Sequence, residues 1–155
     1  MSTVHVMVGI PGSGKSTYSN TVLQPKLQCL IVTSDGIRQE HPDWDEPSVW
    51  AEVYRRIANE LANNRDVIFD ATSCTPRVRA RLFERINELI PNVSYKAGAY
   101  YFPTPSDICF ARIEKRNQVV GEHFFPLDAL QRYADTISEP TTDEGYDFIE
   151  TIICY

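Results

Sequence analysis

One eight-residue segment, Gly9 to Ser16, restricts the possible folds of this chain more than any other feature. It reads GIPGSGKS, follows a short apolar segment and fits the pattern Gly-x-x-x-x-Gly-Lys-Ser. Its glycines let backbone N–H groups turn toward phosphate oxygens, and the following helix adds its positive N-terminus. Lys15 then places an ammonium between the terminal phosphates, and the Ser16 hydroxyl is a magnesium ligand. This P-loop predicts binding of a nucleoside triphosphate, with contacts from Gly12, Ser13, Gly14, Lys15, Ser16 and Thr17.

Segments typical of strands and of helices alternate along the whole chain. Five short segments rich in β-branched or aromatic residues are expected strands: Thr3–Val8, Cys29–Thr33, Asp66–Asp70, Ser94–Phe102 and Phe148–Cys154. Four longer segments are expected helices, and each begins at a proline: Pro47–Asn63, Pro76–Ile90, Pro105–Gln118 and Pro126–Ile137. This order predicts one α/β domain over residues 1–155, with a mainly parallel sheet of about five strands and helices on both faces.

The composition is that of a globular protein. Hydrophobic residues make up 43% of the 155 residues and charged residues 23%, which excludes a disordered chain and a coiled coil. No apolar run approaches the ~18–20 residues that span a bilayer, and the N-terminal residues do not resemble a signal peptide. The cysteines form no CxxC pair, so we expect them to be reduced and mostly buried. Reduced cysteines are typical of a cytoplasmic protein, which is the expected location. They are Cys29, Cys74, Cys109 and Cys154.

The formal net charge of −6 is unevenly distributed. Residues 120–155 contain eight acidic residues and one arginine, a charge of −7, whereas the preceding residues contain 14 basic and 13 acidic residues, a charge of +1. Eleven of the 15 basic residues are arginines, whose forked guanidinium suits phosphate oxygens. The acidic total therefore does not exclude a nucleic-acid partner, but it predicts a few directed contacts rather than coating of a long duplex.

Charged side chains follow two of the expected strands, at the sheet edge where ligands of open α/β sheets bind. Asp35 follows the second strand, and Arg38 lies three residues later on the same face of a helical turn. Asp35 is placed to accept the proton of an acceptor hydroxyl. Asp70 follows the third strand, where it could hold magnesium through water or orient an arginine. The alternative for Asp35 is an N-cap aspartate beside a solvated Arg38. The alternative for Asp70 is a turn residue.

The helices that follow carry arginines of two kinds. Arg79 falls on the apolar face of its helix, which makes it either a site residue or half of a structural ion pair. On the opposite side is an expected solvated stripe, with a smaller chance of contact with an anionic substrate: Arg77, Arg81 and Arg85. Arg112 and Arg116 lie one turn apart before a loop with Gly121, as in a lid that brings a guanidinium to the transferring phosphoryl group. The alternative is two exposed helix arginines.

With these segments in this order, the chain resembles the P-loop polynucleotide kinases, namely the kinase domains of the phage end-healing enzyme and of animal polynucleotide kinase-phosphatases. The matched segments cover essentially the whole chain: GIPGSGKST, SDGIR, IFDATS, RIEKR, PLDAL and EPTTDEGYD. There are two departures: Ser73 stands where relatives often have Asn, and the interval from Arg116 to Pro126 is longer than in the phage enzyme. No DxDGT motif occurs, so no phosphatase domain is expected.

The resemblance implies a role for each matched residue. Lys15 and Ser16 would hold the donor phosphates and magnesium, and Asp35 would be the general base. Arg38 would bind the phosphate next to the acceptor nucleotide, supported by Asp70. Arg112 and Arg116 are further expected contacts of ATP, and Thr72 and Arg79 are further expected contacts of the acceptor. The expected catalytic residues are Asp35, Lys15 and Arg116. The expected metal ligands are Ser16 and Asp70.

The expected function is therefore that of an ATP- and Mg²⁺-dependent kinase of a nucleic-acid hydroxyl, most directly a polynucleotide 5′-hydroxyl kinase. One alternative changes the acceptor to a hydroxymethylated base in DNA, which has to be lifted from the stack, or to a nucleoside or other metabolite. A second alternative is a non-catalytic nucleotide-binding switch, for which replacement of Asp35 has no effect.

Overall fold

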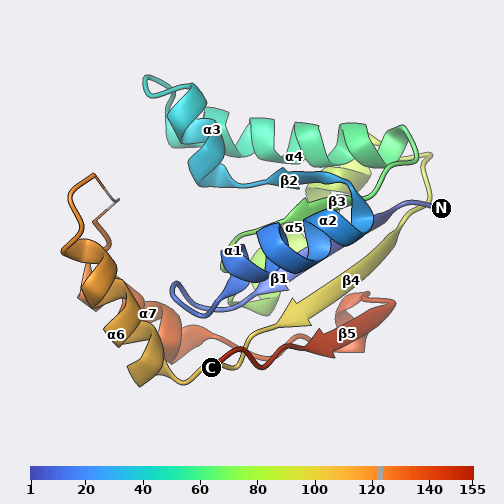
Figure 1. The fold of residues 1–155 in the computed structure, drawn as a ribbon. Coiled ribbons are helices and arrows are strands. Elements are labelled where there is room, and N and C mark those ends of the chain that lie inside the picture. The colour runs from blue at the N-terminus through green and yellow to red at the C-terminus, as the bar shows by residue number, and fades with distance from the viewer. Residues whose placement is uncertain (122–123) are drawn as a thin grey trace.

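A single parallel sheet forms the centre of the computed structural model, which describes residues 1–121 and 124–155 (Figure 1). The strands lie in the order β2-β3-β1-β4-β5, and every neighbouring pair is parallel. Their bounds are β1 Thr3–Val8, β2 Leu30–Val32, β3 Val67–Phe69, β4 Lys96–Tyr101 and β5 Phe148–Thr151. Because all five run the same way, the segments that follow them meet at one edge of the sheet.

Helices connect the strands. They are α1 Lys15–Tyr18, the π-helical turn η1 Ser19–Leu23, α2 Gln24–Leu27, α3 Ser34–Glu40, α4 Glu46–Ala62, α5 Pro76–Leu89, α6 Ser106–Asn117, α7 Leu127–Thr136 and the 3₁₀ turn η2 Thr142–Glu144. Three of them begin at a side-chain cap: Thr33 accepts from the Gly36 N–H, Asp45 from that of Ser48, and Thr75 from that of Val78. No helix among the described residues is both long and apolar enough to cross a membrane.

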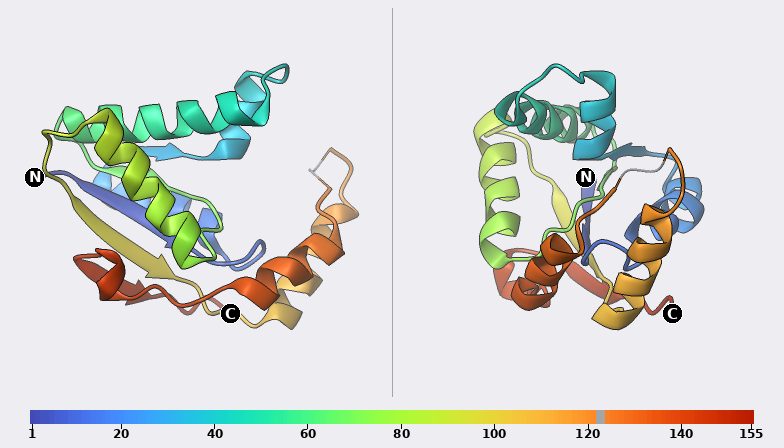
Figure 2. Two further views of the ribbon diagram at one scale, coloured as in Figure 1. Left: turned by 180° about the vertical axis from the view of Figure 1, so that it is seen from behind. Right: turned by 90° about the vertical axis from the view of Figure 1, so that its left-hand side faces the viewer.

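The helices cover both faces of the sheet (Figure 2). Alternate residues of β1 point to opposite faces, so Val4, Val6 and Val8 pack in one core cluster with α4 and α5. Met7 belongs to a second cluster on the other face, together with Leu23 of η1. All of these side chains are at most 4% exposed. The predicted α/β architecture is confirmed, and the expected strand positions differ from the observed ones only by up to three residues at their ends.

A third cluster joins α6 and α7 to the edge of the sheet where the strands end. Cys109 and Ile113 of α6 and Leu130 of α7 pack against Ile10 of the loop after β1 and against Cys74. Both helices stand beyond that edge rather than over a sheet face (Figure 2). This packing fixes the first turns of α6 against the P-loop. The loop between α6 and α7 contains Glu122 and His123, which lie outside the described residues.

Candidate active site

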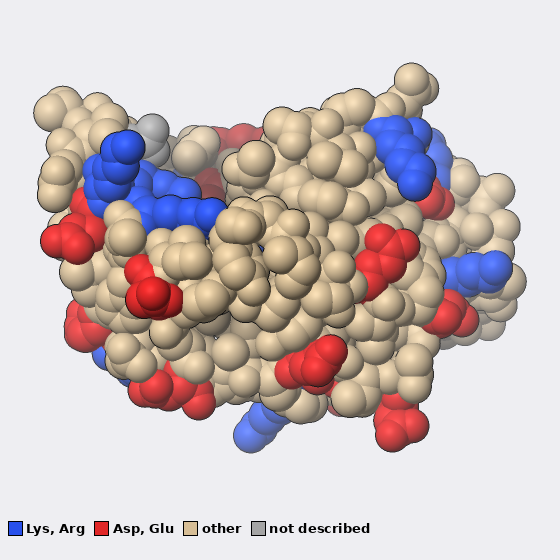
Figure 3. Space-filling view, turned by 60° about the horizontal axis from the view of Figure 1, so that its bottom comes forward, with Lys and Arg blue, Asp and Glu red and all other residues tan. Residues whose placement is uncertain are grey.

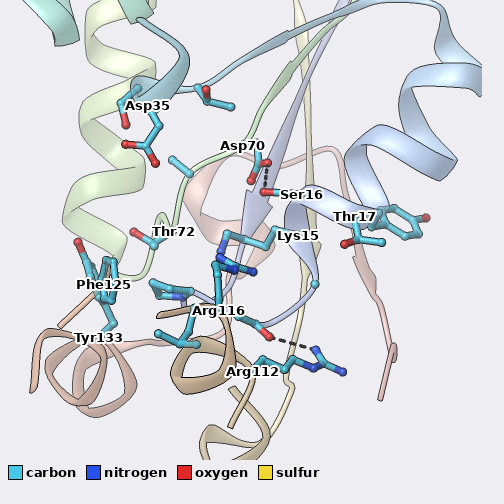
Figure 4. A pocket seen from close by; sticks show the side chains of 18 of the residues that line it. Lys15, Ser16, Thr17, Asp35, Asp70, Thr72, Arg112, Arg116, Phe125 and Tyr133 are labelled. Atoms are coloured by element: carbon cyan, nitrogen blue, oxygen red, sulfur yellow. Dashed lines mark hydrogen bonds between the residues drawn. The ribbon is translucent and has the colours of Figure 1, made fainter. Parts of the chain in front are cut away.

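A pocket of about 690 Å³ lies at the edge where the strands end. Its walls are formed by the P-loop, the start of α3, the segment after β3, and helices α6 and α7 (Figure 4). Most of the residues expected to form the site line it: Gly12, Gly14, Lys15, Ser16, Thr17, Asp35, Arg38, Asp70, Thr72, Arg112 and Arg116. Five chain segments that are far apart in sequence therefore meet in one cavity.

The P-loop has a backbone that only glycine accommodates at two positions. Gly12 has φ +83° and Gly14 φ +104°, both in the left-handed region. A Cβ at Gly12 would also come within 2.9 Å of the Cys109 carbonyl oxygen on α6. Ser13 between them is buried, and its hydroxyl has no hydrogen-bond partner among the described residues. Its backbone carbonyl accepts a hydrogen bond from Thr104, 2.8 Å away.

The side chain of Lys15 is buried against the backbone of the P-loop. Lys15 is 8% exposed, and its ammonium donates to the Ile10 carbonyl oxygen at 3.1 Å. Burial is the main cause that lowers the pKa of Lys15; nearby Arg116 adds to this effect, whereas Asp70 opposes it. An anion bound here would compensate the desolvation of the ammonium, so the site favours a phosphate ligand electrostatically.

Ser16 and Asp70 bring two oxygen donors together. The Ser16 hydroxyl donates to the Asp70 carboxylate at 2.8 Å, although 54 residues separate them in sequence. A hydroxyl and a carboxylate are ligands that suit Mg²⁺, which completes its octahedron with phosphate oxygens and water. Among residues 1–121 and 124–155, no group of three or more His, Cys, Asp or Glu side chains could hold a metal alone. The donor set therefore fits a magnesium ion that arrives with a nucleotide.

Asp35 and Arg38 form an ion pair at the rim of the pocket. The Arg38 guanidinium donates to the Asp35 carboxylate at 2.6 Å and to the Ser34 hydroxyl at 3.1 Å. Glu46, at the start of α4, takes the other side of the fork through two bonds of 2.7 and 2.9 Å. The hydrogen bond from Arg38 is the main cause that lowers the pKa of Glu46. Sequence reasoning missed Glu46, which reads only as an acid in the first turn of a helix.

The two arginines of α6 differ in their contacts. Arg112 donates to the Gly12 carbonyl oxygen at 3.0 Å and to the Cys154 carbonyl oxygen at 3.2 Å. Arg116 points into the pocket toward Lys15 (Figure 4) and has no ion-pair partner among the described residues. Arg116 therefore lines the pocket beside the P-loop, while Arg112 contacts the P-loop backbone.

Family membership follows from a comparison with known protein families. A family model described as an AAA domain matches residues 4–140. The chain belongs to this AAA-domain family. No curated protein is similar enough to match it.

Three solved structures are similar in fold to this protein. Kti12 of Chaetomium thermophilum, in complex with ADP-AlF₃, has a TM-score of 0.76 at 13% identity, covering 97% of this chain and 88% of its own. A fungal RNA kinase has a TM-score of 0.72 at 18% identity, covering 97% and 73%. A gluconokinase from Sinorhizobium meliloti 1021 has a TM-score of 0.58 at 17% identity, covering 97% and 81%. At these identities the likeness establishes a P-loop kinase-type fold.

One expected acceptor contact of this AAA-domain protein needs correction. Arg79 is 1% exposed and does not line the pocket. Its guanidinium donates to the Glu144 carboxylate at 2.6 and 3.1 Å, to the Ser73 and Ser138 carbonyl oxygens at 2.8 and 3.1 Å, and to the Ser138 hydroxyl at 3.0 Å. These bonds occupy the donors that a substrate would need. Arg79 is therefore the structural ion pair that the sequence left as an alternative.

Several pocket residues of the AAA domain carry no sequence signal. They are aromatic or lie near the C-terminal end of the chain: Tyr18, Trp50, Phe125, Tyr133 and Cys154. The Cys154 thiol donates to the Ser13 carbonyl oxygen at 3.1 Å, which places a cysteine against the P-loop. Of the four cysteines, Cys74 and Cys109 are buried, Cys29 is half-buried and Cys154 is exposed, so the expectation of mostly buried thiols is met only in part.

Basic and acidic side chains are unevenly distributed over the surface of the domain. Figure 3 shows basic side chains in two clusters, at the upper left and the upper right of the face that it presents, whereas acidic side chains are scattered over the area between and below them. The last turn of α6 contributes Lys115 and Arg116 to the basic residues of the chain. The net charge of −6 thus coexists with a pocket that holds Lys15 and three arginines.

Proposed function

We propose that this protein is an ATP-dependent kinase that transfers the γ-phosphate of ATP to the 5′-hydroxyl of a polynucleotide. The observation that carries the proposal is the Asp35–Arg38 pair, which lies in the same pocket as Lys15 and Ser16. A P-loop alone accounts for a bound triphosphate. Asp35 and Arg38 add the two groups that an acceptor requires. The carboxylate can take the proton of the acceptor hydroxyl, and the guanidinium can bind the phosphate next to that hydroxyl.

In this mechanism Asp35 accepts the proton of the 5′-hydroxyl while the oxygen of that hydroxyl bonds to the γ-phosphorus. The bond from that phosphorus to the β,γ-bridging oxygen breaks, and ADP leaves with the electron pair. Lys15 and Arg116 stabilise the negative charge on the phosphoryl oxygens. Arg38 holds the 3′-phosphate of the terminal acceptor nucleotide, and Thr72, which lines the same pocket, is a further acceptor contact. Arg112 supports the P-loop through its hydrogen bond to the Gly12 carbonyl oxygen.

Ser16 and Asp70 would hold the magnesium ion of the nucleotide, directly or through water. When bound, the ion neutralises charge on the β- and γ-phosphates. The 2.8 Å hydrogen bond between the two side chains keeps both oxygens at the place where the ion would enter.

The acceptor is tested with labelled ATP, magnesium and a panel of hydroxyl acceptors. We expect label on 5′-hydroxyl oligonucleotides of DNA or RNA and on a nucleoside 3′-monophosphate. Label only on gluconate, on a free nucleoside or on hydroxymethylated bases within DNA would move the acceptor to the alternative class. An absence of transfer to every acceptor, with ATP still bound, would support the nucleotide-binding switch.

Replacing Lys15 by methionine is expected to abolish nucleotide binding without loss of fold. The substitution removes an ammonium whose burial is costly, so the midpoint of thermal unfolding without ligand should stay the same or rise. The stabilisation by ATP should disappear, because a ligand at 100 times its Kd adds about 2.7 kcal/mol to the native state. Differential scanning fluorimetry with and without ATP measures both effects. Lys26→Met, on α2 and outside the pocket, is the control and should keep the ATP-dependent shift.

Replacing Glu46 by glutamine is expected to improve acceptor binding. The Glu46 carboxylate occupies the fork of Arg38 that the acceptor phosphate would use, so the two anions compete. The amide keeps the shape but lowers the competition, and KM for the acceptor should fall by ~3–10-fold, with KM for ATP unchanged. Steady-state kinetics with a nucleoside 3′-monophosphate measures both constants. A rise in acceptor KM would show instead that Glu46 orients Arg38.

A further inference from the structure

A second cavity lies beside the first, between α4 and α5. It has a volume of about 680 Å³, within the range of ligand sites. Trp50, Ala51 and Tyr54 of α4 form one wall, and Val78, Arg81, Arg85 and Leu89 of α5 form the other; Glu46, Pro47 and Glu88 complete it. We call this cavity the α4–α5 groove. None of these residues has a role in the proposed transfer except Glu46, through Arg38.

The groove adjoins the acceptor side of the pocket. Trp50 lines both cavities, and Glu46 at the mouth of the groove is bonded to Arg38 in the pocket. Trp50 therefore lies between the groove and the part of the pocket that Asp35 and Arg38 line. A strand whose end is in the pocket would pass Trp50 to enter this groove.

The wall of α4 carries an aromatic pair suited to stacking. The ring centroids of Trp50 and Tyr54 are 6.0 Å apart. Trp50 packs edge-on against Phe69, with 6.4 Å between their ring centroids. Both side chains are only half-buried, so Phe69 and the core hold them from behind while they line the groove. Aromatic side chains in such positions bind successive bases of a single strand with little sequence preference.

The wall of α5 carries the positive charge. Arg81 and Arg85 lie close enough to Tyr54 to oppose the rise in its pKa that burial causes. Arg81 has no ion-pair partner within the described ranges, and Arg85 pairs only with the exposed Glu88 at 3.0 Å. An exposed pair of this kind contributes little free energy, so a phosphate can replace Glu88. Arg77, the third arginine of this stripe, does not line the groove.

We propose that the α4–α5 groove binds the single-stranded nucleotides that follow the terminal nucleotide of the acceptor, with bases on Trp50 and Tyr54 and phosphodiesters on Arg81 and Arg85. The inference rests on the proposed function, because it extends the same acceptor beyond the pocket. It makes the preferred substrate a strand of several nucleotides rather than a nucleotide or a metabolite. The alternation of rings on one wall and guanidinium groups on the other is what such a strand requires.

The test compares the double variant Arg81→Ala/Arg85→Ala with Arg77→Ala, which removes an exposed arginine of the same helix outside the groove. Alanine favours helix, and all three side chains are exposed, so both variants should fold. The probe is a 5′-hydroxyl single strand of ~8 nucleotides labelled at its 3′ end, and fluorescence anisotropy without ATP measures its Kd. We expect Kd to rise about tenfold in the double variant and to stay near the wild-type value in Arg77→Ala. The slope of log Kd against log salt should fall by about 1.4 in the double variant, at ~0.7 per lost phosphate contact of a single strand.

Transfer to a nucleoside 3′-monophosphate is measured in parallel, because this acceptor reaches the pocket but not the groove. We expect it to be unchanged in the double variant. If the monophosphate is phosphorylated but strand binding is as strong in the double variant as in Arg77→Ala, the groove inference is overturned and the proposed function stands. If neither acceptor is phosphorylated but the double variant alone loses strand binding, the groove inference stands and the proposed function fails.

Discussion

Replacing Asp35 by asparagine is expected to lower the rate of phosphoryl transfer by ~10²–10⁴-fold, which is the usual contribution of a general base. The amide keeps the size of the side chain and a hydrogen-bonding oxygen for Arg38, but it cannot take the proton of the acceptor hydroxyl. Binding of ATP should stay the same, because Asp35 is on the α3 side of the pocket and the P-loop does not contact it. Single-turnover transfer from labelled ATP measures the rate, and a fluorescent ATP analogue measures the affinity.

Asp43→Asn is the matched control for this experiment. Asp43 is an exposed carboxylate in the loop between α3 and α4 that does not line the pocket, so its amide variant should transfer at the wild-type rate. Equal rates for Asp35→Asn and Asp43→Asn would remove Asp35 from the mechanism and favour the nucleotide-binding switch.

Replacing Arg79 by methionine is expected to lower the free energy of unfolding by about 3–5 kcal/mol, as happens when one partner of a buried ion pair is removed. The side chain is 1% exposed and makes five hydrogen bonds to three residues. Without it the Glu144 carboxylate and the Ser73 and Ser138 carbonyl oxygens lose their partner. Urea unfolding at neutral pH measures the difference. Arg77→Met, on the exposed side of the same helix turn, should change the stability by less than about 0.5 kcal/mol.

The loss in Arg79→Met should depend on pH. Burial raises the pKa of Glu144, but the hydrogen bonds from Arg79 and Thr141 outweigh it, and the pKa lies below the ordinary value of 4.5. A lowered carboxylate pKa gives stability that is fully present above 4.5 and is lost as the pH falls through the folded-state value. The gap between wild type and variant should therefore narrow below pH 4.5. A gap that is constant from pH 7 to about 3 would mean that the two carbonyl contacts, not the ion pair, carry the effect.

The fold was predictable because its signals are local. The spacing of Val4, Val6 and Val8 and the helix start at Thr75 and Pro76 act within a few residues, and β1 and α5 begin at the expected positions. Helix α3, with its cap at Thr33, was not among the expected helices. Parallel strands also bring the segments after them to one edge, so Asp35, Asp70 and the P-loop could be placed together without knowledge of side-chain contacts.

Contacts between distant segments were not predictable in the same way. The choice between a site role and an ion pair for Arg79 depends on Glu144, 65 residues away, and no local pattern reports that distance. Glu46 and Cys154 reach the pocket only through the packing of α3 against α4 and of the C-terminal residues against the P-loop. The aromatic wall of the α4–α5 groove likewise looks, in sequence, like the buried face of a helix.

The contacts of Arg79 also hold the end of α7 in place. Ser138 follows α7 by two residues, and its carbonyl oxygen and hydroxyl are both held by Arg79. Its N–H donates to the Cys74 carbonyl oxygen at 2.9 Å, just before α5. Arg79 and Cys74 therefore anchor the residue that follows the end of α7 to the start of α5. The position of that end of the α6–α7 pair is thus set by contacts from a different part of the chain.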